Sequence, residues 1–552
     1  MRSNLLEGKK LEWALLCLFV IAYCVVSLFH EPWYDEALSW QIGKCASLMD
    51  ILITLPPYEG HPPFWHLILA IPAKLGVPFE IGLKSIGLVI STISASVLLF
   101  KSKLPRLARA TLPFTYFFFY QYGIVVRPYG LMLLALLLLG IHLSERNEHP
   151  WRIFFLLLFL CLTSAYGMLM AAGIACCMAF DIWREKGTKE LLKGALKDQR
   201  VLSLLVLLLC ALILVVEFFP AADGYSVSIE GDNPLWLCIL CALVSLPLNC
   251  FFLSSTWFGI EQLCMRTMSI SSVELISCCF IGGLFWLLVL CASSKKNVKY
   301  LVVPFAFYAF FAATVYFSTH HIGLVFLLFL FWAELISRDE NKFEIGKALV
   351  HRIAKSDKDQ KLLRKVFVVA CGFCVVIPLY WFASASVLDI GSNYSYARET
   401  ASYLKDHGLE NNLILCQWNF EGSTFARSEG HDDYINTYIV DSAVTIDAYF
   451  SHNICMNLNK GADEYAYVLH KVPDYLESRS MVEEWATMGI PDVIIGQPNL
   501  KYVYGNMISY KDYALVARIE SGFIWKNKSA TGITRIYVRN DLLDQYGLKE
   551  ID

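Results

Sequence analysis

Two acidic motifs follow the first apolar run of this chain and carry groups able to do acid–base chemistry. Asp35 and Glu36 come shortly after the run 11–29, and Glu59 and His61 stand in the sequence Glu-Gly-His-Pro-Pro. Carboxylates beside a long apolar run are costly unless they face water, a cation or a partner. They are therefore candidates for a general base and its neighbours. The alternative is a hydrated loop, or a helix start that favours negative charge.

Arg127 is the best candidate for a cationic partner of these acids. It follows the apolar run 113–126 and precedes Pro128 and Tyr129, so its guanidinium is expected at the end of a span, where it can bind a phosphate with two hydrogen bonds. The alternative is an arginine that reaches the lipid headgroups. Tyr129, Tyr166, His320 and His321 lie at similar ends of apolar runs and are further candidates, against the alternative of interfacial belt residues.

The composition indicates a polytopic membrane protein. The chain has 552 residues, of which 56% are hydrophobic, and a mean hydropathy of +0.49. Many apolar runs fit a hydrocarbon core of about 30 Å, and the first run is expected to stay as an anchor because no convincing cleavage site follows it. Nothing in the composition favours nucleic-acid binding. The chain has neither a Walker-type loop nor a dinucleotide fingerprint, so the energy of any synthetic reaction must come with the substrate.

The positions of lysine and arginine predict the orientation in the membrane. Counting spans between the basic segments gives about 11 to 13 crossings, with the N-terminus in the cytoplasm and the C-terminus outside. Residues 63–100 hold two apolar runs, one of which is expected to lie along the interface or to re-enter. The segments expected in the cytoplasm are the N-terminus and residues 101–109, 144–152, 183–200, 293–299 and 338–365.

The tail has mixed charge and short alternating patterns, which predict a separate α/β unit. Expected helices cover residues 398–407 and 473–488, and expected strands cover 412–417, 492–495, 514–519 and 533–538. The fold class is thus an all-α polytopic membrane domain over residues 1–386 and an extracytoplasmic α/β domain over residues 387–552. Of the 18 cysteines, only Cys416 and Cys455 fall in this tail, and they can pair in an oxidising compartment.

The order of these motifs resembles the C-type glycosyltransferases. Asp35-Glu36 in the first outside loop, Glu59 to Pro63 before the next apolar run, Arg127-Pro128-Tyr129 and a soluble tail are similar to the bacterial protein O-mannosyltransferase and aminoarabinose-transferase families. The resemblance covers roughly residues 11–382. In some relatives a lysine stands near His61, so this histidine departs from the pattern.

The resemblance implies transfer of a sugar from a polyprenyl-phosphate donor to an extracytoplasmic acceptor, with inversion at the anomeric carbon. It implies Asp35 as the base and Glu36, Glu59, His61, Arg127, Tyr129, Tyr166, His320 and His321 as substrate-binding residues. The acceptor is a lipid, a protein or a glycan. No cofactor is required in the closer relatives, but carboxylates with a histidine also suit Mg²⁺ or Mn²⁺. The aromatic run 114–122 is expected to wall the lipid groove, and the loop 220–234 to cover the site.

Two other classes of protein share these features. A transporter or flippase would use the outer acids and Arg127 as a substrate path, but the paired halves common in such proteins are not evident in the sequence. A lipid-linked polysaccharide polymerase or ligase would normally place its key residues in a large late loop. Here the acids cluster early in the chain.

Overall fold

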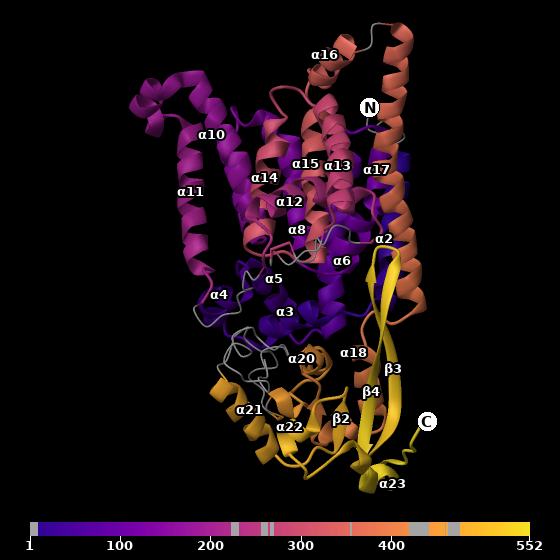
Figure 1. Ribbon diagram of the computed structural model, residues 1–552. Coiled ribbons are helices and arrows are strands. Elements are labelled where there is room, and N and C mark those ends of the chain that lie inside the picture. Colours follow the sequence, from indigo (N-terminus) through magenta and orange to yellow (C-terminus); the bar gives the residue numbers. More distant parts are fainter. Residues whose placement is uncertain are drawn as a thin grey trace.

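The protein is a bundle of apolar helices joined to a smaller α/β unit (Figure 1). The computed structural model describes residues 9–221, 231–255, 263, 264, 266, 270–353, 356–418, 441–458, 460, 461 and 475–551. The helices of the bundle are α2 (Lys10–Phe29), α6 (Phe79–Lys101), α8 (Tyr129–His142), α9 (Pro150–Cys161), α10 (Ala165–Gly194), α11 (Gln199–Glu217), α12 (Leu235–Phe251), α13 (Ser272–Ala292), α14 (Lys299–Thr314), α15 (Leu324–Ser337), α16 (Glu344–Ile353) and α17 (Asp357–Gly391).

Seven helices within the described residues are long and apolar enough to cross a membrane: α2, α6, α10, α11, α13, α17, and α15 together with the turn η7 (Thr319–Gly323) before it. Five more apolar helices are shorter, namely α5 (Phe64–Lys74), α8, α9, α12 and α14. A bundle of this kind followed by an α/β unit confirms the predicted fold class.

Short helices fill the space between the bundle and the C-terminal unit (Figure 1). They are α3 (Tyr34–Cys45), the π-helix η1 (Asp50–Thr54), α4 (Pro56–Glu59) and α5 (Phe64–Lys74). The 11 residues of α5 span about 16 Å at 1.5 Å per residue, about half of a hydrocarbon core. Of the two apolar runs in residues 63–100, only α6 is therefore long enough to cross. Helices α3 and α5 approach closely at Gly43, where a Cβ would lie 3.0 Å from the Ala70 nitrogen.

The C-terminal unit is built on a four-stranded sheet in the order β1-β2-β4-β3. Strand β1 (Ile414–Cys416) is parallel to β2 (Val493–Ile495), and β4 (Lys528–Arg539) is antiparallel to both β2 and β3 (Tyr513–Trp525). Helices α18 (Ala397–Asp406), α20 (Asp441–Asp447), α21 (Tyr475–Thr487), α22 (Leu500–Tyr504) and α23 (Leu543–Tyr546) complete the unit. Each of the four predicted strands and both predicted helices is found, and β3 and β4 extend beyond their predicted bounds.

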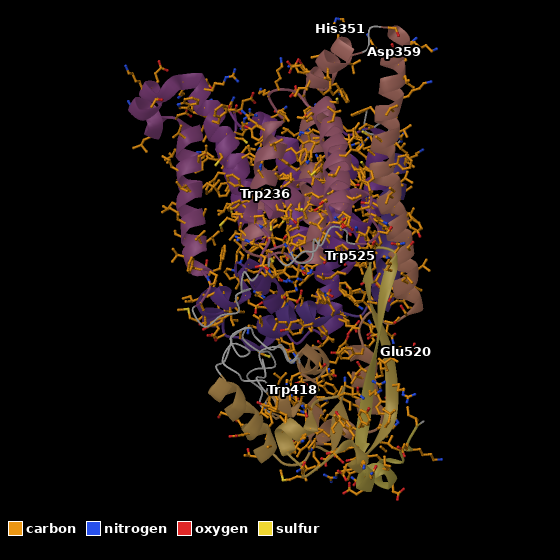
Figure 2. All side chains as sticks on the ribbon, viewed as in Figure 1. Trp236, His351, Asp359, Trp418, Glu520 and Trp525 are labelled. Atoms are coloured by element: carbon orange, nitrogen blue, oxygen red, sulfur yellow. The ribbon has the colours of Figure 1, made fainter. Side chains whose placement is uncertain are left out.

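The hairpin of β3 and β4 reaches from the C-terminal unit into the bundle (Figures 1 and 2). Its turn lies between the paired residues Trp525 and Lys528, and Lys526 adopts a positive φ of 58°, as two-residue hairpin turns require. Ile524 is completely buried within the same apolar cluster as the bundle helices, and the Lys526 ammonium donates hydrogen bonds to the carbonyls of Asn249 and Leu253. The two units therefore share one core. The division at residue 387 stays a prediction, because α17 runs through it to Gly391.

The predicted cytoplasmic segments lie at the end of the bundle away from the C-terminal unit. Figure 1 places the N-terminus, α16 and the start of α17 at that end. Ion pairs or hydrogen bonds connect several of these segments: Arg106 and Arg109 with Glu12, Arg338 with the Lys101 carbonyl, and Lys295 with Glu344. The grouping is the one that the positive-inside rule predicts.

Candidate active site

The site is centred on an ion pair between Asp35 and Arg127. Asp35 lies in the first turn of α3, where a carboxylate is favoured by the helix dipole. Arg127 lies between the π-helix η3 (Tyr116–Ile124) and α8. Its Nη1 is 2.7 Å from Asp35 Oδ2, and the two side chains are 11% and 23% exposed, respectively. The predicted base and the predicted phosphate ligand are therefore in direct contact and still reachable from outside, while their roles in a reaction stay predictions.

Glu36, unlike its neighbour Asp35, is completely buried. Its Oε1 accepts a hydrogen bond from the Val126 amide at 2.7 Å, and its Oε2 accepts one from the Trp33 amide at 3.2 Å. Both carboxylate oxygens are thus bound to main-chain amides that flank the ion pair. Its placement therefore favours a role in orienting the site over the substrate-binding role that the resemblance implies.

Three predicted residues meet in one hydrogen-bonded group beside Arg127. The Nε2 atom of His321 lies 2.8 Å from the Tyr129 hydroxyl, and its Nδ1 atom lies 3.1 Å from the Tyr166 hydroxyl. Tyr166 also donates to the Tyr316 carbonyl. Tyr129 in turn interacts electrostatically with Arg127. Because these side chains are buried, they are suited to holding Arg127 in place from inside the protein.

His61, His320 and His321 form a second group, two members of which interact with Arg127. His61 interacts electrostatically with both His320 and His321, and Arg127 interacts with the same two residues. The His320 ring contacts the ring of Trp33 at a centroid distance of 6.0 Å. The structure therefore places the motif around residue 61 and the His-His pair around one centre. His66, which no sequence pattern singled out, also interacts with His61.

Glu59 ends α4 and is half-buried. Burial raises the pKa of its carboxyl group to about 8. At neutral pH this side chain is therefore mainly protonated and can donate a hydrogen bond, which a carboxylate cannot do. Its predicted contact with acceptor or sugar stays a prediction.

The structure also adds two buried residues that the sequence motifs did not include. His30 follows α2 directly, and its Nδ1 atom lies 2.9 Å from Oδ2 of Asp389 near the end of α17. Its Nε2 atom is 3.5 Å from Oε2 of Glu36. The position of His30 immediately before Glu31, at the end of the first span, is a signal that could have drawn attention to it. Nothing near Asp389 in the sequence indicates its partner.

The aromatic run is placed differently from the expected groove wall. Residues Tyr116 to Ile124 form η3, and all of them are buried inside the bundle. Phe119 packs on Phe382, and Tyr116 packs on Trp525 at the hairpin tip. The run is therefore part of the core and receives the hairpin. Of the predicted cover loop, residues 222–230 lie outside the described residues.

Within the residues that the structure describes, no group of three or more histidine, cysteine, aspartate or glutamate side chains is arranged to hold a metal ion. The groups that the structure brings together, a carboxylate, a guanidinium and several histidines, are suited to acid–base and anion-binding chemistry. A carboxylate next to a guanidinium can accept a proton once the cation is drawn to another anion, and the nearby histidines can assist in binding that anion.

Searches with the sequence found no matching family model and no matching curated protein. Among solved structures, the chain is similar to that of ArnT from Cupriavidus metallidurans bound to undecaprenyl phosphate. The identity is 14% and the TM-score is 0.48, over 96% of this chain and 98% of that chain. This similarity does not assign the chain to a family.

Proposed function

We propose that this protein is a membrane glycosyltransferase that moves a sugar from a polyprenyl-phosphate donor to an extracytoplasmic acceptor, with inversion at the anomeric carbon. The observation that carries the proposal is the 2.7 Å ion pair between Asp35 and Arg127. It joins a candidate base and a candidate phosphate ligand in one place. Helix α3, which carries Asp35, lies between the apolar bundle and the C-terminal unit (Figure 1), and a donor with a lipid tail and a polar head would need such a position.

The pair is a closed form that the donor opens. The phosphodiester of the donor competes with Asp35 for the guanidinium of Arg127, and the sugar then separates the two side chains. Asp35 is left free to accept a proton from the acceptor. As the acceptor oxygen bonds to the anomeric carbon, the bond from that carbon to the phosphate oxygen breaks. The polyprenyl phosphate leaves with one additional negative charge, which Arg127 and its histidine neighbours stabilise.

The remaining groups support this centre. Tyr129, His320 and His321 interact with the guanidinium, and His61 and Tyr166 interact with these histidines. Protonated Glu59 donates a hydrogen bond to sugar or acceptor. Because Arg127 meets the charge of the leaving group, we infer that no divalent ion is required. Activity that disappears with a chelator and returns with Mn²⁺ would contradict this inference.

The orientation follows from the basic segments, which favour a cytoplasmic N-terminus and a C-terminal unit outside a multi-pass plasma or inner membrane. The site then faces the outside. The acceptor, a lipid, a protein or a glycan, is then reached from that side.

The test uses membrane vesicles that contain the protein and a panel of polyprenyl-phosphate donors labelled in a hexose, a pentose or an amino sugar. We expect label to enter a new glycosidic product, and Asp35→Asn to reduce the rate about 10²- to 10⁴-fold, the usual contribution of a general base. The control is Asp50→Asn, since Asp50 is an acid of the neighbouring η1 that bonds Ser47 and Thr54. Movement of the labelled lipid across the bilayer without a new bond would contradict the proposal and support a flippase.

A further inference from the structure

A chain of buried charged side chains runs from the end of α17 to the ion pair. Asp389, His30 and Glu36 are each no more than 1% exposed. His30 lies between the two carboxylates, with Nδ1 2.9 Å from Asp389 and Nε2 3.5 Å from Glu36. Two buried carboxylates on either side of one imidazole favour its charged form, because each stabilises the positive charge. Such an arrangement is costly to bury and needs a reason.

Glu36 connects His30 to both members of the ion pair. It follows Asp35 in α3, and its Oε1 binds the amide of Val126, the residue before Arg127, at 2.7 Å. One side chain therefore fixes the start of α3 and the main chain that carries the guanidinium. A hydrogen bond from an amide to a carboxylate is among the stronger ones in proteins.

The surroundings of His30 hold it in this position. The rings of Tyr120 and Tyr394 lie against it at centroid distances of 6.3 and 4.7 Å. Its carbonyl oxygen accepts hydrogen bonds from Lys84 of α6 and Arg398 of α18. Glu31, the next residue, is also buried. Groups from α3, α6, α17 and α18 thus converge on this one residue.

We propose that Asp389, His30 and Glu36 form a positioning relay that fixes the main chain at Val126 and so holds the Arg127 guanidinium where the donor phosphate can reach it, with the end of α17 setting this geometry. The relay rests on the proposed function for its role in the reaction. None of its three residues needs to touch the substrate. Because α17 leads directly into the C-terminal unit, the relay also connects the seating of that unit to the site.

The test compares Glu36→Gln and Asp389→Asn with a matched control. Glu334→Gln is suited to this because Glu334 is likewise completely buried and binds a main-chain amide, that of Lys103, at 3.1 Å. Glu334 lies near the end of α15, whereas His321 and the site precede the start of that helix. Amide hydrogen exchange of the peptide containing Val126 reports the relay without any need for activity.

In Glu36→Gln and Asp389→Asn we expect faster exchange around Val126, about a tenfold higher KM for the donor, and an acid limb of the kcat/KM profile displaced to higher pH. The limb moves because a guanidinium that is less well placed stabilises the ionised Asp35 less. Glu334→Gln should leave all three unchanged, and Asp389→Glu, which keeps the charge, should restore them.

Unchanged exchange at Val126 in both relay variants would overturn the proposal. The proposal would also be overturned if the variants lose activity while their donor KM and pH profile stay as in the wild type. That result would indicate a merely structural role. If the wild-type protein transfers no sugar, the proposed function fails, and the exchange measurement still decides whether the relay exists.

Discussion

At the scale of single residues, the proposed reaction depends on a guanidinium that exchanges the Asp35 carboxylate for a phosphate. Arg127 is only 11% exposed and already binds Asp35. Its planar group can bind two oxygens of a phosphate, whereas the ammonium of lysine binds as a point charge. A positive charge at residue 127 is therefore not sufficient, and the shape of the guanidinium is needed as well.

We expect Arg127→Lys to raise the KM for the polyprenyl-phosphate donor about 10- to 100-fold, because hydrogen bonds to charged groups contribute about 1.5–3 kcal/mol each. Steady-state kinetics with the donor varied at saturating acceptor measures this. Arg152→Lys is the control, since Arg152 is a partly exposed arginine that pairs with Glu145 in a predicted cytoplasmic segment. A donor KM equal to that of the wild type in Arg127→Lys would show that the guanidinium does not bind the phosphate.

Glu59 gives a prediction about pH. Burial raises its pKa to about 8 in the folded protein, above the ordinary value of 4.5. The folded state therefore binds a proton that the unfolded state has lost, and this carboxyl group makes the protein less stable as the pH rises from about 4.5 to about 8. The melting temperature of Glu59→Gln should fall less over that interval than that of the wild type. If the melting temperatures of the two proteins fall equally between pH 4.5 and pH 8, the Glu59 carboxyl group is solvated and its pKa is not raised.

At the scale of elements, local sequence patterns predicted the helices of the bundle and the strands of the C-terminal unit. Apolar length and the basic segments predicted the bundle, and alternation predicted β1, β2 and the inner parts of β3 and β4. The order of motifs anticipated that Asp35 and Arg127 would meet. The pairing of His30 with Asp389 could not be predicted, because the two are 359 residues apart and neither lies in a pattern that indicates the other.

The hairpin is the clearest element that the patterns missed. Its strands continue past the predicted ends until Ile524 enters the core of the bundle. We expect Ile524→Ala to cost about 2–4 kcal/mol and to speed hydrogen exchange at the hairpin tip. The control is Ile533→Ala in the partner strand, where Ile533 is 51% exposed and the cost should stay within about 0.5 kcal/mol. Equal effects of the two changes would show that the tip is not docked.

At the scale of the whole molecule, the shared core makes the C-terminal unit part of the site. Phe523 of the hairpin packs on Trp33, two residues before Asp35, at a centroid distance of 5.4 Å. Arg398 of α18 binds Glu80 of α6 with two hydrogen bonds of 2.7 Å. The division into two domains, although predicted from the sequence, therefore does not separate the candidate site from the tail.

The compartment of this unit leads to a prediction about cysteines. The sulfur atoms of Cys416 and Cys455 lie 3.3 Å apart and are completely buried, so a small movement would bring them to the bond length of about 2.05 Å. If the unit lies outside the cytoplasm, we expect a disulfide in protein from native membranes. Mass spectrometry of unreduced peptides tests this. Alkylation of both thiols in denaturant without reductant would contradict it.

The most direct test of the central claim is an experimental density map of the protein with a polyprenyl-phosphate sugar bound. We expect the ion pair to be open in this map, with the phosphate within about 2.7–3.2 Å of the Arg127 guanidinium and Asp35 on the opposite side of the sugar, facing the acceptor. A donor bound elsewhere while Asp35 and Arg127 remain in contact would contradict it.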